Sequence, residues 1–128
     1  MVRKQSAFTL VEMLVVMAIV GLLLTIAVPR YMRSVDQSRE NVLRHNLIAI
    51  RVAIDQFDAD QGKLPQTLED LVARRYLRQV PKDPITDRSD TWQVLKHPAS
   101  AGDSDVRIHD VRSGALGTGS DGTAYASW

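Results

Sequence analysis

The pattern of apolar and polar positions begins with an apolar run of 21 residues, from Phe8 to Val28, that contains one charged residue, Glu12. At about 1.5 Å of rise per residue, a helix of this length spans about 31 Å. This span matches the hydrocarbon thickness of a lipid bilayer, which is about 30 Å. The run therefore predicts a helix long enough to cross a membrane.

Pro29 closes the apolar run and marks a change in the pattern. A proline inside a helix removes one backbone hydrogen bond and clashes with the preceding turn, so we expect the helix to kink or end there. Beyond it, apolar residues recur at spacings of three and four, which predicts that the helix resumes with one apolar stripe. The stripe consists of Leu43, Leu47, Ile50, Ile54 and Phe57.

The polar residues Arg39, Glu40, Arg44, Arg51, Asp55 and Asp58 are assigned to the opposite face of this amphipathic helix. We expect the helix to end at Gln61, because Gly62 suits the left-handed position after a helix. A coiled coil is the alternative, but the stripe covers little more than two heptads, and a coiled coil needs three or four. A head packed on the stripe is therefore favoured.

The rest of the chain, 62–128, predicts a small head. Thr67 and Asp70 form a capping pattern that starts a short helix, on which Leu68, Leu71 and Val72 are expected to face the long helix. The segment from Pro81 to Asp90 predicts an irregular surface loop. Two β-prone runs, Trp92–Leu95 and Val106–Val111, predict an antiparallel hairpin whose loose tip is Lys96–Asp105. The hairpin is expected to bury Trp92, Val94, Val106 and Ile108 on the stripe.

The predicted fold class is therefore α+β, with a long N-terminal helix packed against a small antiparallel sheet. A chain of 128 residues has room for one such head and its appendage. It contains no cysteine, so packing, a metal or neighbouring subunits must hold the head together. The net charge of +1 gives no sign of a nucleic-acid partner.

Three interpretations compete for the apolar N-terminus: an ordinary signal peptide, a plain membrane anchor and a processed prepilin-type segment. Thr25 and Ala27 offer a small-x-small site for signal cleavage. Against this, the run is longer than the 7 to 15 residues of a usual signal, and a carboxylate such as Glu12 costs about 2.5 to 3.5 kcal/mol in a membrane. The basic residues on either side of the run do not decide its orientation.

The stretch from Arg3 to Glu12 resembles the processing site of type IV pilins and type II secretion pseudopilins. The resemblance implies that a prepilin peptidase removes residues 1–7 by cutting between Ala7 and Phe8, and then methylates the new amine of Phe8. Ala7 stands where the family usually has glycine. The resemblance also implies a single pass through the bacterial inner membrane, with the leader in the cytoplasm and the head in the periplasm.

Glu12 would be the fifth residue of the processed chain. A carboxylate among leucines and valines needs a positive partner, and the apolar run contains no lysine or arginine. The resemblance implies that this partner is the terminal amine of Phe8 in a neighbouring subunit, which would make Glu12 a residue for filament assembly. The alternative is that Glu12 extends to the lipid headgroups on the cytoplasmic side.

The segments Gly62–Pro65 and Tyr76–Pro84 resemble the major pseudopilin of type II secretion. The resemblance implies a homopolymeric filament in protein export, with minor pseudopilins and an inner-membrane assembly platform as further partners. The expected organisation is a leader (1–7), a transmembrane or filament-core helix (8–28), an amphipathic continuation (29–61) and a head (62–128). The alternatives are a type IV pilus subunit, a secreted binding domain cleaved after Ala27 and a monomeric membrane-anchored regulator.

Residues for catalysis or metal binding are sparse. The three histidines, His45, His97 and His109, have no metal-ligand spacing, and we expect no enzymatic activity. The resemblance to major pseudopilins implies a Ca²⁺ loop near the C-terminus, in which Asp121 matches the family's Asp-Gly pair. One carboxylate is few for an ion that takes six to eight oxygens, so an ordinary turn is the alternative. Tyr125 and Trp128 are expected to pack on the head.

Overall fold

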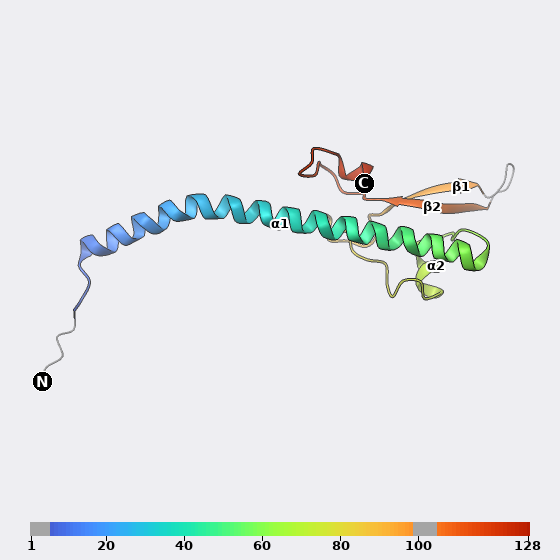
Figure 1. Ribbon diagram of the computed structural model, residues 1–128, viewed down its shortest axis with the longest axis horizontal. Helices are drawn as coiled ribbons and strands as arrows, with labels where there is room; N and C mark the ends of the chain where they lie inside the picture. Colours follow the sequence, from blue (N-terminus) through green and yellow to red (C-terminus); the bar gives the residue numbers. More distant parts are fainter. Residues whose placement is uncertain (1–5, 99–104) are drawn as a thin grey trace, which may run out of the picture. The chain divides into compact units, whose positions relative to one another are not determined.

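The computed structural model describes residues 6–98 and 105–128. Its elements are α1 (Leu10–Gln61), α2 (Leu68–Ala73), β1 (Gln93–Pro98), β2 (Val106–Arg112) and the short 3₁₀ helix η1 (Tyr125–Ser127) (Figure 1). This order confirms the predicted α+β class. The chain divides into two compact units between Val35 and Asp36, so α1 contributes its first half to one unit and its second half to the other.

The first unit consists of the N-terminal half of α1. The Thr9 hydroxyl accepts a hydrogen bond of 3.2 Å from the Glu12 backbone N–H, which satisfies one of the free donors at the start of the helix. The helix does not end at Pro29, because α1 continues to Gln61. The predicted kink at Pro29 stays a prediction.

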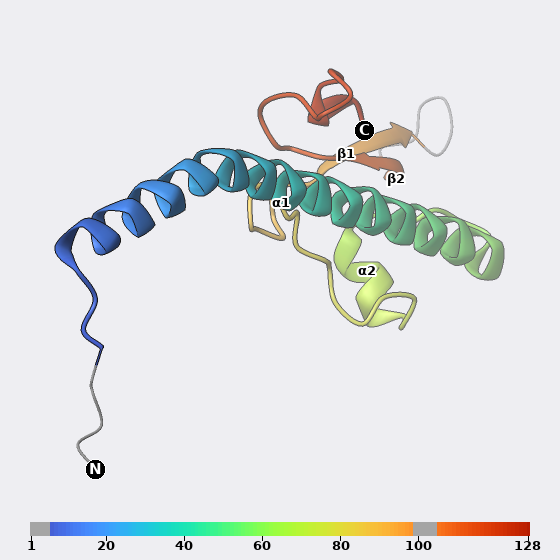
Figure 2. The same cartoon turned by 60° about the vertical axis from the view of Figure 1, so that its left-hand side comes forward.

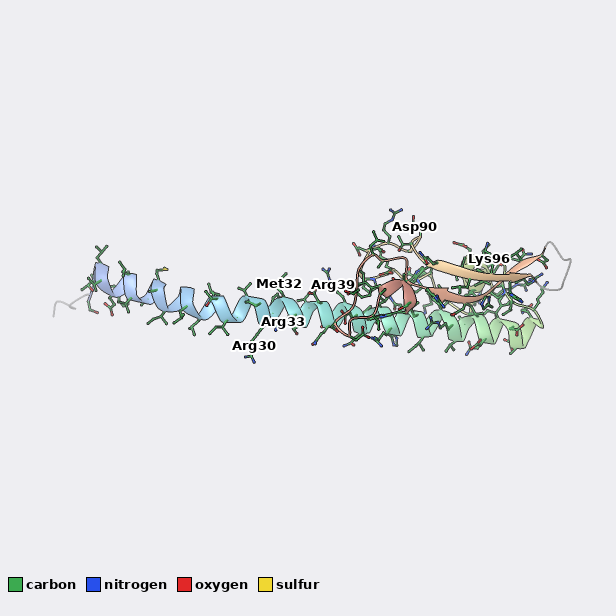
Figure 3. The ribbon with its side chains drawn as sticks, turned by 90° about the horizontal axis from the view of Figure 1, so that it is seen from above. Arg30, Met32, Arg33, Arg39, Asp90 and Lys96 are labelled. Atoms are coloured by element: carbon green, nitrogen blue, oxygen red, sulfur yellow. The ribbon has the colours of Figure 1, made fainter. Side chains whose placement is uncertain are left out.

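The side chains of residues 10–28 are exposed in this unit. A window of 18 residues in α1 has a mean hydropathy of 2.7 with none of it buried, so the helix is long and apolar enough to cross a membrane. The Thr25 hydroxyl donates to the Leu22 carbonyl at 2.6 Å, so its polar group is satisfied within the helix. Arg30 and Arg33 follow the run and are exposed (Figure 3).

The second unit is the head, whose core forms on the second half of α1. The whole predicted stripe is buried, and its residues are between 0% and 6% exposed. Each large apolar side chain buried in this way contributes about 1.5 to 3 kcal/mol to stability. The helix ends at Gln61 as predicted, and Gly62 takes a φ of +68°, which favours glycine.

The assignment of Glu40 to the solvent face was wrong, because the residue is 6% exposed. Glu40 precedes Leu43 by three residues and therefore extends the apolar stripe by one position. Arg51, assigned to the same face, is half-buried: its Nε donates to Asp110 at 2.8 Å and its Nη2 to the Val111 carbonyl at 2.9 Å. Arg39, Arg44, Asp55 and Asp58 are exposed as predicted.

Helix α2 forms as its capping pattern predicts. The Thr67 hydroxyl accepts from the Asp70 N–H at 3.3 Å, and the Asp70 carboxylate accepts from the Thr67 N–H at 3.0 Å. Leu68 and Leu71 are buried in the core, while Val72 is half-buried. In the head, α2 and the two strands lie on different sides of α1 (Figures 1 and 2).

Strands β1 and β2 form an antiparallel pair, but three details differ from the prediction. First, β1 runs on through Lys96 to Pro98, so these residues lie in the strand and not in the hairpin tip. Second, Val106 is 43% exposed and Val94 only half-buried, whereas Trp92 and Ile108 are buried as expected. Third, Val111 is fully buried. Most of the predicted tip, 99–104, lies outside the described residues.

A bulge explains the burial of Val111. Leu95 pairs with Asp110 and Lys96 with Ile108, so His109 is an extra residue in β2. The extra residue shifts the alternation of side chains, and Ile108 and Val111 face the core although they are three positions apart. A regular strand with period two would not bury both.

Candidate functional site

The predicted cleavage site lies in the exposed, non-helical segment before α1. Ala7 and Phe8 precede the first helical residue, Leu10, and Phe8 is 72% exposed. Arg3 and Lys4, which precede the predicted cut, lie outside the described residues. The peptide between Ala7 and Phe8 therefore lies in exposed chain outside the helix, where its backbone is not engaged in helical hydrogen bonds.

Glu12 lies in the first turn of α1 and is exposed. Within residues 6–98 and 105–128, no hydrogen bond or ion pair to its carboxylate is found. Its backbone N–H is capped by Thr9, a contact that the sequence analysis did not consider, although Thr-x-x-Glu is a known helix-start pattern. The acidic side chain thus lies at the end of the helix where the macrodipole favours negative charge.

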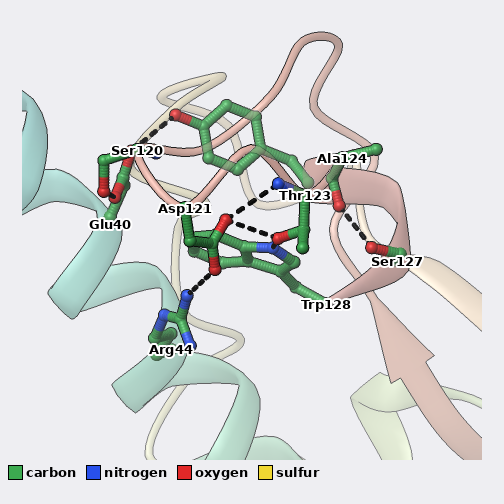
Figure 4. A network of polar contacts seen from close by, with 9 residues as sticks. Glu40, Arg44, Ser120, Asp121, Thr123, Ala124, Ser127 and Trp128 are labelled. Carbon is green, nitrogen blue, oxygen red and sulfur yellow. Dashed lines mark hydrogen bonds and ion pairs between the residues drawn. The ribbon is translucent and has the colours of Figure 1, made fainter.

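Asp121, the candidate Ca²⁺ residue, has both carboxylate oxygens engaged (Figure 4). Oδ1 accepts from the Thr123 N–H at 2.9 Å and from its hydroxyl at 2.6 Å. Oδ2 accepts from Arg44 Nη2 at 2.7 Å. The Thr123 hydroxyl, with the Thr123 N–H and then Arg44 adding to it, holds the pKa of Asp121 below its ordinary value. Asp121 therefore carries its negative charge and shares it with a guanidinium.

These contacts do not fit a Ca²⁺ site. Calcium takes six to eight oxygens, usually from several carboxylates. In the part of the chain that the structure describes, no three acidic or histidine side chains gather closely enough to hold a metal ion. The positive Arg44 on the one carboxylate of the loop would also repel a divalent cation.

Glu40 is the residue of this region that the sequence analysis missed. Its carboxylate accepts from the Ser120 N–H at 2.7 Å, from the Ser120 hydroxyl at 2.5 Å and from the Tyr125 hydroxyl at 3.2 Å. The Ser120 hydroxyl is the main cause that lowers the pKa of Glu40, against the opposing effect of burial. Burial, together with the nearby Glu40 carboxylate, raises the pKa of Tyr125. The signal in the sequence was the three-residue spacing from Glu40 to Leu43.

The aromatic residues at the C-terminus pack on the head as predicted. Tyr125 and Trp128 are half-buried against the core and meet edge to face, with ring centroids 5.1 Å apart. Strand pairing also brings the rings of His97 and His109 together, with their centroids 5.9 Å apart. His45 lies on the exposed side of α1.

Comparison with known proteins places these features in a family. The model of the prokaryotic N-terminal methylation motif matches residues 2–28, which cover the predicted leader and the apolar run. Type II secretion system core protein G of Vibrio cholerae is 30% identical over 136 aligned positions, which cover 93% of this chain and 90% of the relative. The protein of the same name from Pseudomonas aeruginosa is 35% identical over 98 positions, covering 64% of this chain and 69% of the relative. The protein of the same name from Escherichia coli is 28% identical over 138 aligned positions, which cover 95% of this chain and 92% of the relative.

A chain that combines a prepilin-type N-terminus with a small α+β head is of the pilin-like class. Within that class, the extent and identity of these matches show that the chain belongs to the family of type II secretion system core protein G, the major pseudopilins. This confirms the resemblance seen in the Arg3–Glu12 stretch. No solved structure matches the chain.

Proposed function

We propose that the chain is a structural pseudopilin subunit that polymerises into a helical filament of a type II secretion system and acts in protein export, without enzymatic activity. The observation that carries this proposal is the exposed apolar surface of residues 8–28, most of it on α1, in which no residue is buried. Such a surface is stable in lipid. Outside lipid it is stable only where other apolar surfaces cover it, and the same surface on neighbouring copies would do so.

Glu12 would set the register of the filament. It is the one charged residue of the apolar run, and its carboxylate has no partner in the described part of the chain. In a bundle of these helices, the methylated amine of Phe8 on a neighbouring copy would supply the opposite charge, because removal of residues 1–7 creates that amine. A buried carboxylate without such a partner would weaken the bundle.

The finer assignments belong to the same proposal. A prepilin peptidase cuts the chain between Ala7 and Phe8. Residues 8–28 then form the segment that lies in the membrane and later in the filament core. Residues 29–61 continue the helix into the head, which begins at residue 62. The chain crosses the inner membrane once, with its head in the periplasm, and is assembled with minor pseudopilins by the inner-membrane platform. The membrane-capable helix and the family support this arrangement.

Mass spectrometry of the mature chain, produced together with a prepilin peptidase, tests the processing step. The expected N-terminus is methylated Phe8, and a variant in which Ala7 is replaced by a bulky charged residue (Ala7→Lys) should stay uncut. An N-terminus at Val28 would show an ordinary secreted domain and overturn the proposal.

The filament is tested by overproduction of the chain with its assembly platform and electron microscopy of the product. Filaments that disappear when the peptidase is omitted are the expected result. A chain that is processed and yet stays monomeric would favour a membrane-anchored regulator. In a strain that lacks this chain, restoration of protein secretion supports a pseudopilin, whereas surface fibres without secretion would point to a type IV pilus subunit.

A further inference from the structure

We infer that the C-terminal loop, Gly117–Trp128, is held on α1 by a metal-free latch in which the Arg44 guanidinium supplies the positive charge for Asp121. The latch consists of this loop together with Glu40 and Arg44 of α1. All of it lies in the head unit. The inference concerns how the head closes and does not depend on filament assembly.

The backbone of the loop is closed on itself. Thr118 and Ala124 form an antiparallel bridge, and the Gly119 N–H donates to the Thr123 carbonyl at 2.8 Å. The Tyr125 N–H donates to the Gly117 carbonyl at 3.1 Å. These bonds shape the loop but do not reach α1. Attachment to the helix must therefore come from side chains.

Arg44 makes the first attachment through two different interactions. Its Nη2 donates to Asp121 Oδ2 at 2.7 Å, and its guanidinium carbon lies 4.0 Å from the centroid of the Trp128 ring. The planar, delocalised cation of arginine can make both contacts at once, because its edge donates hydrogen bonds while its face stacks on a ring. One side chain of α1 therefore holds the middle and the end of the loop together.

A closed cycle of four side chains results. Trp128 Nε1 donates to the Thr123 hydroxyl at 2.6 Å, and that hydroxyl donates to Asp121 Oδ1 at 2.6 Å. Asp121 binds Arg44, and Arg44 lies on the Trp128 ring (Figure 4). Each member thus fixes the position of the next, and both carboxylate oxygens of Asp121 are used within the cycle.

Gly119 allows the Trp128 ring to reach this position. A β-carbon on residue 119 would lie 2.4 Å from Cζ2 of Trp128, which is far inside van der Waals contact. A larger residue at position 119 would displace the ring and with it the contact between Trp128 and Arg44. The glycine therefore belongs to the latch for a steric reason.

Glu40 makes the second attachment, one helical turn before Arg44. Residues four apart lie on the same side of a helix, so α1 presents a carboxylate and a guanidinium side by side. Glu40 accepts two hydrogen bonds from Ser120, while Arg44 donates to the adjacent Asp121. The opposite charges on the helix thus fix which loop residue faces which turn.

The latch makes a bound cation unnecessary for closing the loop. The resemblance to major pseudopilins implied Ca²⁺ in this loop, but here the positive charge is covalently part of α1. We therefore expect the stability of the head to be independent of Ca²⁺ and of chelators. The closure of the C-terminal loop should depend on Arg44 and Asp121 instead.

The first arm of the test measures thermal unfolding of the full chain in detergent micelles, with either CaCl₂ or EDTA present. The expected result is the same Tm in both. A Tm that rises with Ca²⁺ and falls with EDTA would overturn the inference. This arm uses the unmodified chain and does not depend on whether any variant folds.

The second arm measures amide hydrogen exchange in segment 117–128 of the Arg44→Gln and Asp121→Asn variants. The loss of a partly exposed ion pair and of a cation–π contact should speed exchange about three- to thirtyfold in this segment, with protection of β2 unchanged. Arg44→Lys keeps the charge but loses the planar fork, and should show an intermediate rate.

The matched control is Arg88→Gln, which removes an ion pair with Asp90 whose side chains are 65% and 63% exposed. It should leave exchange in 117–128 as in the unmodified chain. Exchange in Arg44→Gln and Asp121→Asn at the rate of this control would overturn the inference. The double variant that combines Arg44→Gln with Asp121→Asn should exchange no faster than either single variant. This result supports the latch, because both single changes open the same cycle.

Discussion

The Ser113 hydroxyl donates a hydrogen bond of 2.5 Å to Asp83 Oδ2, and both residues are 0% exposed. This contact joins the segment before β1 to the segment that follows β2. The other oxygen of Asp83 accepts from the Ile85 N–H at 2.8 Å, and the Ala115 N–H donates to the Ser113 hydroxyl at 3.1 Å. A buried carboxylate is stable only with such donors, so Asp83 fixes a loop that the sequence predicted as irregular surface.

Replacement of Asp83 should therefore destabilise the head. In Asp83→Ala, the Ser113 hydroxyl and the Ile85 N–H lose their acceptor in a buried site, which costs about 1 to 3 kcal/mol for each unsatisfied group. Urea unfolding of the full chain in detergent, followed by tryptophan fluorescence in a Trp128→Phe background so that Trp92 is the remaining tryptophan, measures the change. Trp92 is a suitable probe because its Nε1 donates to the Pro81 carbonyl at 2.8 Å. Asp90→Ala on the exposed side of the same loop is the control, and equal shifts in both variants would contradict the role of Asp83.

The core on α1 and α2 gives a second prediction. Leu71 is 0% exposed, and Leu71→Ala should lower the free energy of unfolding by about 2 to 5 kcal/mol through lost burial and a cavity. Leu116 is 94% exposed, and Leu116→Ala should change it by less than about 0.5 kcal/mol. The urea midpoints of the two variants provide the measurement. The comparison is matched because both variants replace leucine by alanine. A small effect at Leu71 would show that α2 is not part of the cooperative core.

The Glu40 carboxylate predicts how the stability of the head depends on pH. Its pKa in the folded head lies below the ordinary value of 4.5, mainly because of the Ser120 hydroxyl. The ionised group therefore stabilises the fold above the ordinary pKa, and this contribution is lost as the pH falls through the lowered pKa. The lowered pKa values of Asp121 and Asp110 act in the same direction.

Glu40→Gln isolates this effect. At about pH 7 the variant should have a lower urea midpoint than the unmodified chain, and the difference should shrink as the pH approaches about 3. Glu69→Gln, at an exposed position on α2, is the control and should leave the midpoint unchanged. A difference for Glu40→Gln that stays constant from pH 7 to pH 3 would mean that the lost charge is not the cause.

Glu12 gives a prediction about assembly. Glu12→Gln keeps the size of the side chain but removes the charge that would pair with the Phe8 amine of a neighbour, so the yield of filaments should fall at least about tenfold. Thr9→Ala removes the helix cap and keeps the carboxylate, and it should retain filaments. Electron microscopy of matched amounts of chain measures both. Normal filaments from Glu12→Gln would remove the pairing, and equal losses in the two variants would assign the effect to the helix cap.

The features that sequence alone determined are those that depend on neighbours along the chain. The long helix, the buried stripe from Leu43 to Phe57, the cap formed by Thr67 and Asp70, and the helix end before Gly62 all follow from local spacing and backbone preference. The prepilin processing pattern is equally local, because it occupies ten consecutive residues.

Tertiary structure decided what depends on residues far apart. Glu40 is buried only because Ser120 and Tyr125, at least 80 residues away along the chain, supply donors. Val111 faces the core only because β1 pairs with β2 across a bulge at His109. The family resemblance suggested Asp121 as an ion ligand, with an ordinary turn as the alternative, and the fold pairs its carboxylate with Arg44. The identity of a carboxylate's partner is a question of three-dimensional distance, and spacing along the chain does not contain it.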